Sequence, residues 1–452
     1  MKIYEDSVQE EMILKEIVEY TLKLVKNYKK KYLASVSIHK TNGINLTVRS
    51  GILDYLEFNN DTVLTITVYY NNRKSMVSST DLNLSSIKIA VDTAIQIVEY
   101  ISKDLCHTLP NYNLLAMYQH NLKLSYPCLL SIKEVVFITK QIEEFSLQED
   151  SRIIHSEGSS FFSHIHTIVL GNTLHMLNSY KTSIHSFSIS VVARDYKIMD
   201  GMEREYYYTT SRKFNNLISP IIMGKIVSNK AISKLGSKKI FTKKTPILFD
   251  SEVSASIFSH FMYSIQGSNV YRKNTILLNA MNTAVFPIWL SIIDNPKLEE
   301  GLGSKPFDLE GVMTKKHTIV ERGILKTWLL DTYFSNKLNL TSTGHSGGIH
   351  NWLILGQSSV DISNLCKIMH RGVYITELMG DGVNIMTGTY SRGASGFWID
   401  NGKIQYPINE ITISGNLKDM WKNIVMIGND TDMRKRIQCG SILISDIQIS
   451  GK

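Results

Sequence analysis

Cysteine is scarce in this chain of 452 residues, which contains only four. No two of them form a Cys-x-x-Cys pair, and they stand at Cys106, Cys128, Cys366 and Cys439. A large chain with so few cysteines is typical of a reducing compartment, whereas small secreted folds are rich in disulfides. The sequence therefore predicts a cytoplasmic protein without a disulfide framework.

Long apolar runs are absent as well. The nearest candidate for a membrane span, residues 275–293, is interrupted by Asn279, Asn282 and Pro287. A spanning helix needs about 18 or more consecutive apolar residues. The opening segment MKIYEDSVQEEM is acidic, where a signal peptide would be basic and then apolar. We therefore expect no membrane partner.

The motifs of several enzyme classes are missing too. The chain has no Gly-x-Gly-x-x-Gly fingerprint and no Gly-Lys-Ser/Thr loop for a nucleotide, and no Gly-x-Ser-x-Gly elbow for a serine hydrolase. The dipeptide His-Glu occurs nowhere, so neither form of the zinc-peptidase helix, His-Glu-x-x-His or His-Glu-x-x-x-His, is present. Common nucleotide, serine and zinc chemistries are thus unsupported by any motif.

Charge of one sign does not dominate. The chain has 49 basic and 41 acidic residues, a formal charge of +8, and an ordinary 43% of hydrophobic residues. An excess of this size permits attraction to nucleic acid, so a nucleic-acid or regulator-binding protein stays open as an alternative. No groove-reading motif accompanies the charge, and we therefore expect no nucleic-acid partner.

The hydrophobic pattern predicts an α+β protein of three domains. Residues 1–105 contain a helix, an antiparallel meander and a second helix, and form an N-terminal domain with flanking helices. Residues 126–238 form a central α+β domain, and residues 240–452 a mainly β C-terminal domain. Hairpin turns are predicted at five dipeptides: Asn42-Gly43, Ser50-Gly51, Asn59-Asn60, Glu157-Gly158 and Asn401-Gly402.

Two loops concentrate polar side chains that can contact a ligand. Residues 377–407 are rich in glycine and carry Ser391 and Arg392, which can bind a peptide carboxylate or carbonyl. His345 and His350 flank a second glycine-rich loop. Both loops can also be turns that contact no ligand, because glycine supplies the backbone conformations that tight turns require.

Five segments of the chain, in order, carry a further signal: residues 267–287, 301–325, 340–352, 376–420 and 427–444. They resemble one family, TldD/PmbA, and within it the PmbA branch, also called TldE. Weaker similarity continues upstream through 155–164 and 200–212. The resemblance implies a cytoplasmic metallopeptidase system. Roles associated with such systems are the degradation of an unfolded antitoxin and the trimming of leader peptides from modified peptides.

The resemblance also implies where a zinc site would lie. TldD-type chains carry His-Glu-x-x-x-His on a helix after a strand, and a downstream Cys completes their site. Here that helix begins near Asp250, and Glu252 has no His before it. Cys439 follows an Ile-Gly-Asn-Asp segment as the ligand Cys does in those chains, but without two His partners it would hold zinc poorly.

The resemblance therefore predicts a subunit that lacks zinc and any catalytic residue of its own. Its expected partner is a TldD-type chain that supplies the zinc and the hydrolysis. Its expected ligand is an extended or unfolded peptide, with four residues lining the cleft: Ser391, Arg392, His345 and His350. An independent metal-dependent hydrolase, with a site built from His345, His350, Cys439 and Arg392, is the remaining alternative.

Overall fold

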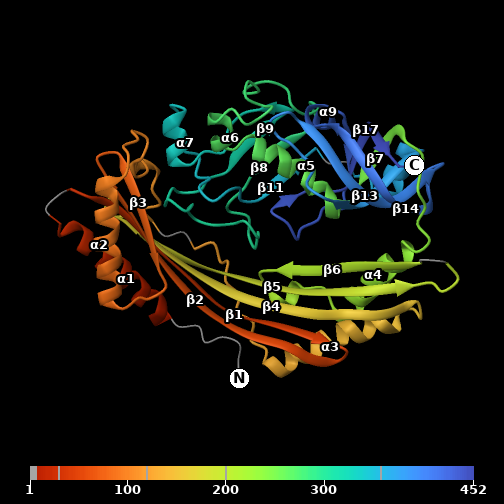
Figure 1. The fold of residues 1–452 in the computed structure, drawn as a ribbon, viewed down its shortest axis with the longest axis horizontal. Helices are drawn as coiled ribbons and strands as arrows, with labels where there is room; N and C mark the ends of the chain where they lie inside the picture. The colour runs from red at the N-terminus through yellow and green to blue at the C-terminus, as the bar shows by residue number, and fades with distance from the viewer. Residues whose placement is uncertain (1–7, 29–30, 119–120, 199–200, 357–358, 452) are drawn as a thin grey trace.

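The structure, a computed structural model, describes residues 8–28, 31–118, 121–198, 201–356 and 359–451. A long antiparallel sheet forms the lower part of the molecule in Figure 1, with helices beneath it and at its left end and the C-terminal domain above. The predicted α+β fold class is confirmed. Among the helices of the described residues, none is long and apolar enough to cross a membrane.

The long sheet has six strands in the order β3-β2-β1-β4-β5-β6. They are β1 (Leu33–Arg49), β2 (Ile52–Tyr70), β3 (Arg73–Ser79), β4 (Ile153–Asn172), β5 (Leu177–Arg194) and β6 (Met202–Ser211). The central β1–β4 pair opposes Ile44 to Ser163, so one sheet runs through residues that the sequence pattern divides between two domains.

One face of this sheet is apolar and is covered by four helices. They are α1 (Val8–Lys26), α2 (Leu84–Tyr100), α3 (Ile132–Gln148) and α4 (Pro220–Ser233). Alternation along β1 explains the cover, since side chains two apart share a face. Val36 and Ile38 pack in the core under α1 and α2, whereas Ile44 and Leu46 pack under α3 and α4. The residues between them in β1, such as Ser37 and Asn45, are polar and face the opposite side of the sheet.

Two predicted turns in the first meander are wrong. Asn42-Gly43 and Asn59-Asn60 both lie inside long strands, where Asn42 pairs with Asn60 and Gly43 with Asn59. The local hairpin signal is overridden because β1 is paired on both sides, which fixes its backbone as extended. A side chain at Gly43 would also meet His164 of β4, which explains the glycine.

The predicted hairpin at Glu157-Gly158 is also wrong, whereas the one at Ser50-Gly51 is confirmed. Gly158 lies within β4 at a shift in the β4–β5 register, with φ of 116°, so the glycine marks a bulge. Ser50 and Gly51 both have positive φ and connect β1 to β2. The Glu143 carboxylate of α3 accepts both of their amide N–H groups and holds this hairpin against the helix.

The C-terminal domain contains two further sheets. The larger has the order β14-β13-β12-β7-β17-β15 and closes into a barrel where β14 also pairs with β17. Its strands are β7 (Lys243–Phe249), β12 (Gly372–Met379), β13 (Thr389–Asp400), β14 (Lys403–Asn416), β15 (Ile424–Ile427) and β17 (Ile442–Ser450). Asn401 and Gly402, with φ of 50° and 70°, form the predicted β13–β14 hairpin.

The smaller sheet has the order β10-β9-β8-β11-β16 and is bordered by short helices. Its strands are β8 (Ser291–Asp294), β9 (His317–Glu321), β10 (Ile324–Leu325), β11 (Trp352–Leu355) and β16 (Ile437–Gln438). The helices of this domain are α5 (Ser251–Ser264), α6 (Gly267–Tyr271), α7 (Thr332–Lys337), α8 (Ile362–Met369) and α9 (Leu417–Lys422).

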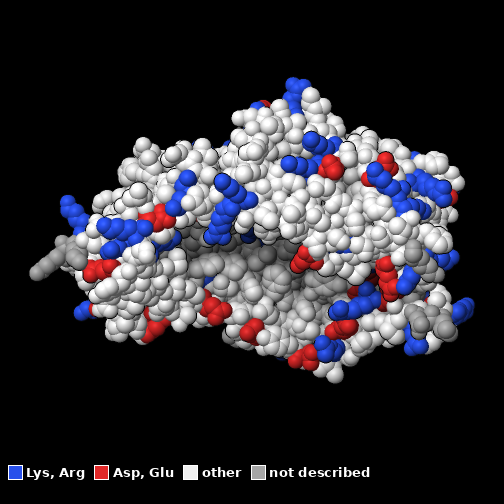
Figure 2. All heavy atoms as spheres, turned by 45° about the horizontal axis from the view of Figure 1, so that its top comes forward, with Lys and Arg blue, Asp and Glu red and all other residues white. Residues whose placement is uncertain are grey.

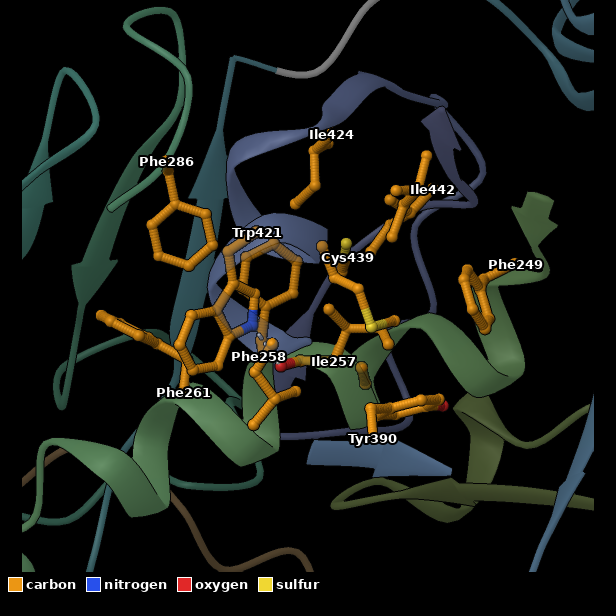
Figure 3. Packing of buried hydrophobic residues seen from close by; sticks show 14 of the residues in the cluster. Phe249, Ile257, Phe258, Phe261, Phe286, Tyr390, Trp421, Ile424, Cys439 and Ile442 are labelled. Carbon is orange, nitrogen blue, oxygen red and sulfur yellow. Dashed lines mark hydrogen bonds between the residues drawn. The ribbon is translucent and has the colours of Figure 1, made fainter. Parts of the chain in front are cut away.

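Helix α5 is held in place by the largest core cluster. Asp250 caps its first turn by accepting the Glu252 N–H at 2.8 Å. Phe258 and Phe261 then pack among aromatic and aliphatic side chains, and the Trp421 indole donates to the α5 backbone at Ile257 (Figure 3). This packing fixes α5 rigidly and leaves its first turn directed at the sheet below.

Candidate functional site

A hollow lies between the six-stranded sheet and the C-terminal domain (Figure 2). Two cavities, of about 720 and 570 Å³, follow one another along strand β6. Arg204, Tyr206 and Tyr208 line the larger one together with the first turn of α5, and Thr210 lines the smaller one together with residues 298–302. We call these two cavities, with β6 between the layers, the groove.

Strand β6 is an edge strand whose free backbone groups face this groove. It pairs only with β5 among the described strands, and the carbonyl of Tyr208 points away from β5 to accept from Arg434 at 2.8 Å. Both backbone groups of a strand residue point to the same side, and this direction alternates along the strand. The N–H and C=O groups of Arg204, Tyr206 and Thr210 therefore also point away from β5.

A cluster of cations surrounds Glu252 at the first turn of α5, in the wall of the groove. One carboxylate oxygen contacts the Lys230 ammonium group, and the other accepts from Arg434 at 3.0 Å. Lys435 donates to the backbone carbonyl of Glu252. Burial raises the pKa of Glu252, but the charges of Lys230 and Arg434 outweigh burial and hold this pKa below its usual value. Glu252 is therefore an ionised partner in a salt-bridge network.

The same network extends to Asp432. Arg434 forms a bidentate pair with its carboxylate, at 2.8 and 3.1 Å, and Lys435 lies 3.2 Å away. Three cations thus share two carboxylates around the start of α5. A Zn²⁺ ion needs neutral or anionic ligands with open lone pairs. The charge and the hydrogen bonds of this cluster are therefore unfavourable for a cation.

His345 and His350 come together with Asp294, at the end of β8, in a closed site. His345 Nε2 and His350 Nδ1 each lie 2.8 Å from the same Asp294 oxygen. All three side chains are buried. Among the described residues, they form the group whose three metal-ligating atoms all lie within 4.8 Å of one another. Neither His lines the groove. The pair instead ties the 340–352 loop to β8 through Asp294.

Cys439 lies elsewhere in the domain core. Trp352 pairs with Ile437 in a parallel ladder. His350 comes two residues before Trp352 and Cys439 two residues after Ile437, so they lie toward opposite ends of this ladder. The Cys439 thiol is fully buried among Ile257, Tyr390 and neighbouring apolar side chains (Figure 3), and burial raises its pKa. Of the four residues of the alternative hydrolase site, the structure brings His345 and His350 together, and Cys439 does not belong to their group.

Ser391 and Arg392 lie on β13, and neither is among the residues that line the groove. Ser391 is exposed, and its backbone N–H donates to the Gly382 carbonyl. Arg392 donates to the Gly380 carbonyl at 2.8 Å and so fastens the loop between β12 and β13 to the strand. Peptide contact by these two residues stays a prediction.

Three family models match consecutive parts of the chain. The PmbA/TldA metallopeptidase domain 1 matches residues 34–98, the central domain matches 126–235, and the C-terminal domain matches 242–451. This chain belongs to the PmbA/TldD family. The fold, the groove and the α5 cluster are thus features of a PmbA/TldD protein.

The similarity to PmbA proteins covers the full length. The chain is 46% identical to the metalloprotease PmbA homolog of Buchnera aphidicola subsp. Acyrthosiphon pisum over 451 residues, covering 100% of both chains. It is 43% identical to the metalloprotease PmbA of Escherichia coli O157:H7, covering 100% of this chain and 99% of that one. A metalloprotease TldD homolog of the same Buchnera is 23% identical and covers 63% of this chain.

Solved structures share the fold. A crystal structure from Bacteroides thetaiotaomicron superimposes with a TM-score of 0.91 at 24% identity, covering 97% of this chain and 99% of that chain. TldE from Thermococcus kodakarensis superimposes with a TM-score of 0.82 at 16% identity, covering 98% of this chain and 100% of that chain.

Within the PmbA/TldD frame, the important residues that sequence reasoning missed are the cations around Glu252. If Glu252 is aligned with the Glu of His-Glu-x-x-x-His, then Ser251 and Ser256 stand at the two His positions. Lys230 comes from a different domain and no local pattern links it to Glu252. The run Arg434-Lys435 lies four residues before Cys439, and its charge was the one available signal.

Proposed function

We propose that this chain is the peptide-holding subunit of a cytoplasmic metallopeptidase complex, and that the zinc and the hydrolysis belong to a TldD-type partner. Its ligands are extended or unfolded peptides, as in the antitoxin degradation and leader-peptide trimming that the family resemblance implies. In this role the chain needs no cofactor and no metal ligand of its own, and the groove is its peptide-binding surface.

The observation that carries the proposal is the state of Glu252. In a zinc peptidase the motif Glu must accept a proton from a metal-bound water, so its carboxylate needs an open lone pair beside the metal. Here Lys230 and Arg434 occupy both oxygens, and serines stand at the adjoining ligand positions. The carboxylate therefore stabilises the fold between α4, α5 and residues 434–435.

The edge of β6 supports the choice of an extended peptide as ligand. Backbone groups at Arg204, Tyr206 and Thr210 can accept an additional antiparallel strand without any sequence-specific pocket. Such pairing recognises the main chain of the peptide, so it suits unfolded segments of many sequences. Arg434 occupies the Tyr208 carbonyl midway along this edge, and a bound strand takes its place or passes beside it.

The metal assignment is tested on the purified chain alone and on the chain co-purified with a TldD-type protein. We expect metal far below one equivalent and no peptide cleavage by the single chain. Chelator-sensitive cleavage should appear with the complex. Cleavage by the single chain that a chelator abolishes would show that it carries its own metal site, and the proposal would fail.

The peptide-binding edge is tested with Tyr206→Pro. Proline has no N–H, and the Tyr206 N–H points away from β5, so the change removes one donor for a peptide while sparing the β5–β6 bonds. We expect the affinity for a labelled neutral peptide to fall about tenfold. Tyr206→Ala is the matched control, because it removes the ring and keeps the N–H, and it should bind nearly as wild type does. Equal losses in both variants would contradict backbone pairing.

The same assay tests the predicted wall residues. Arg392→Ala and Ser391→Ala should weaken peptide binding if β13 contributes to the wall of the peptide site. Wild-type affinity in both variants would remove them from the binding surface and would leave the β6 edge as its principal element.

A further inference from the structure

Basic side chains gather at one end of the C-terminal barrel. β7 and β12 begin at this end, β13 ends there and β14 begins there. Figure 2 shows Lys and Arg side chains at the right-hand end of the molecule, where β13 and β14 lie in Figure 1. We call the following six residues the basic rim: Lys238, Lys239, Lys243, Lys367, Arg371 and Lys403.

Contacts between these residues show that they form one surface. Lys243 and Arg371 both lie over the Trp398 ring, at 3.5 and 5.5 Å from its centroid. Lys403 pairs with Asp400 across the β13–β14 hairpin, and the Gly402 of this hairpin packs against Lys367. Lys238 lies over Tyr406, the residue that pairs with Trp398. Five of the six residues thus lie around Trp398 and the β13–β14 hairpin.

The rim has too few acidic partners for its charge. Across the whole chain 49 basic residues face 41 acidic ones. In the rim, Arg371 pairs with Asp400 and Lys239 with Glu410. Among the described residues, no carboxylate lies within 4.0 Å of the ammonium groups of Lys238, Lys243, Lys367 and Lys403, although Lys403 is opposite Asp400 in the β13–β14 ladder. Burial lowers the pKa of Lys243, the neighbouring Arg371 charge lowers it further, and the Asp400 charge offsets part of this shift. Like charges are therefore held together, and an added anion would relieve their repulsion.

The position of the rim indicates which anion it meets. Phe397, the neighbour of Trp398 on β13, lines the larger cavity of the groove. Lys234 lines the same cavity, and Lys238 follows it by four residues in sequence. The larger cavity and the rim are therefore joined by the short chain from Lys234 to Lys238, and an acidic segment that continues from a bound peptide has only this short distance to span.

We propose that the basic rim is an exosite that docks acidic segments of the peptides held in the groove. The proposal rests on the proposed function, and it adds a substrate preference that β6 cannot supply. Main-chain pairing in the groove recognises any extended peptide, whereas the rim selects those that carry a run of Asp or Glu beside the paired segment. Exposed charge pairs of this kind contribute little singly, so the selection comes from several lysines acting together.

The test measures binding of three labelled peptides by fluorescence anisotropy. All three share one neutral extended segment, and two carry an added run of glutamates or of lysines. The rim variant is Lys367→Glu/Arg371→Glu/Lys403→Glu. The matched control is Lys88→Glu/Lys103→Glu/Lys133→Glu, which makes the same charge change at exposed positions of the N-terminal and central domains. Melting temperatures confirm that both variants are folded.

We expect the wild type to bind the glutamate peptide about tenfold more tightly than the neutral one, with an advantage that shrinks as salt increases. The rim variant should lose this advantage and keep its affinity for the neutral peptide, and the control variant should keep both. Equal binding of the acidic and neutral peptides, or an unchanged advantage in the rim variant, would overturn the proposal. Tighter binding of duplex DNA or anionic vesicles at the rim would overturn it too.

The two proposals can fail separately. If the neutral peptide binds nowhere and the glutamate peptide still binds through the rim, the groove assignment fails and the exosite remains. If the neutral peptide binds through β6 and glutamates add nothing, the exosite fails and the groove assignment remains.

Discussion

Arg212, directly after β6, fastens the long sheet to the C-terminal domain. Its side chain is 4% exposed and donates to the carbonyls of Gly301 at 2.9 Å, Leu302 at 3.0 Å and Ser304 at 3.4 Å. It also donates to the Ser183 carbonyl at 3.2 Å. Because Gly301 and Leu302 line the groove, this residue sets the spacing of the two layers there.

We predict that Arg212→Met destabilises the C-terminal domain by about 3 kcal/mol. Hydrogen bonds to a charged donor contribute about 1.5–3 kcal/mol each, and four carbonyls lose their donor in the variant. Removal of a buried guanidinium also recovers part of its desolvation cost, and burial already lowers the pKa of Arg212 to about 10. The two effects oppose each other, and the lost hydrogen bonds exceed the recovered solvation.

The assay is urea unfolding followed by tryptophan fluorescence, because all five tryptophans lie between residues 289 and 421. A loss of about 3 kcal/mol should lower the fluorescence midpoint by about 1 M urea, given a slope of about 3 kcal/mol/M. In far-UV circular dichroism, the part of the signal that comes from the long sheet should be lost at a higher urea concentration than the tryptophan signal, since the long sheet no longer unfolds together with the barrel. Arg194→Met, an exposed change on the same sheet, is the control. A fluorescence-midpoint shift as small as that of the control would refute the role of Arg212 in fastening the two layers.

Three further outcomes follow from buried groups. Glu252→Gln should lower stability by about 1–2 kcal/mol, measured by thermal unfolding, because it removes a charge shared by Lys230 and Arg434; no stability loss in this variant would contradict the structural role of Glu252. A thiol reagent should label Cys106 quickly and Cys128, Cys366 and Cys439 only after unfolding, since these three are buried; rapid reaction of Cys439 would place it on an open surface. Burial lowers the pKa of His260 to about 4; the Arg392 charge adds to this shift, and the Asp381 charge opposes it. Between about pH 6.5 and 4 the unfolded state therefore binds a proton more readily than the folded state, and stability falls as the pH drops through this window. His260→Gln should reduce this loss of stability, measured as melting temperature at a series of pH values. The same pH profile in the variant and the wild type would refute this role of His260.

Local features of the fold were predictable where local physics decides them. The Ser50-Gly51 and Asn401-Gly402 hairpins formed as expected, because both have residues that tolerate positive φ and strands that can end there. The same reasoning failed at Asn42-Gly43, since β1 continues through it and is paired to β2 and β4 at once. Pairing with a strand more than a hundred residues away leaves no mark on the local pattern.

The candidate site divides in the same way. The missing His-Glu dipeptide alone removed the known zinc motif, and the segments shared with the PmbA branch identified the family. Only the tertiary structure placed Lys230 and Arg434 on Glu252, buried His345 and His350 against Asp294, and turned the free edge of β6 into the groove. Sequence determines which side chains are present and which local structures they favour. Long-range packing decides which charges meet and which backbone groups stay open, because these depend on contacts between segments that are distant in the chain.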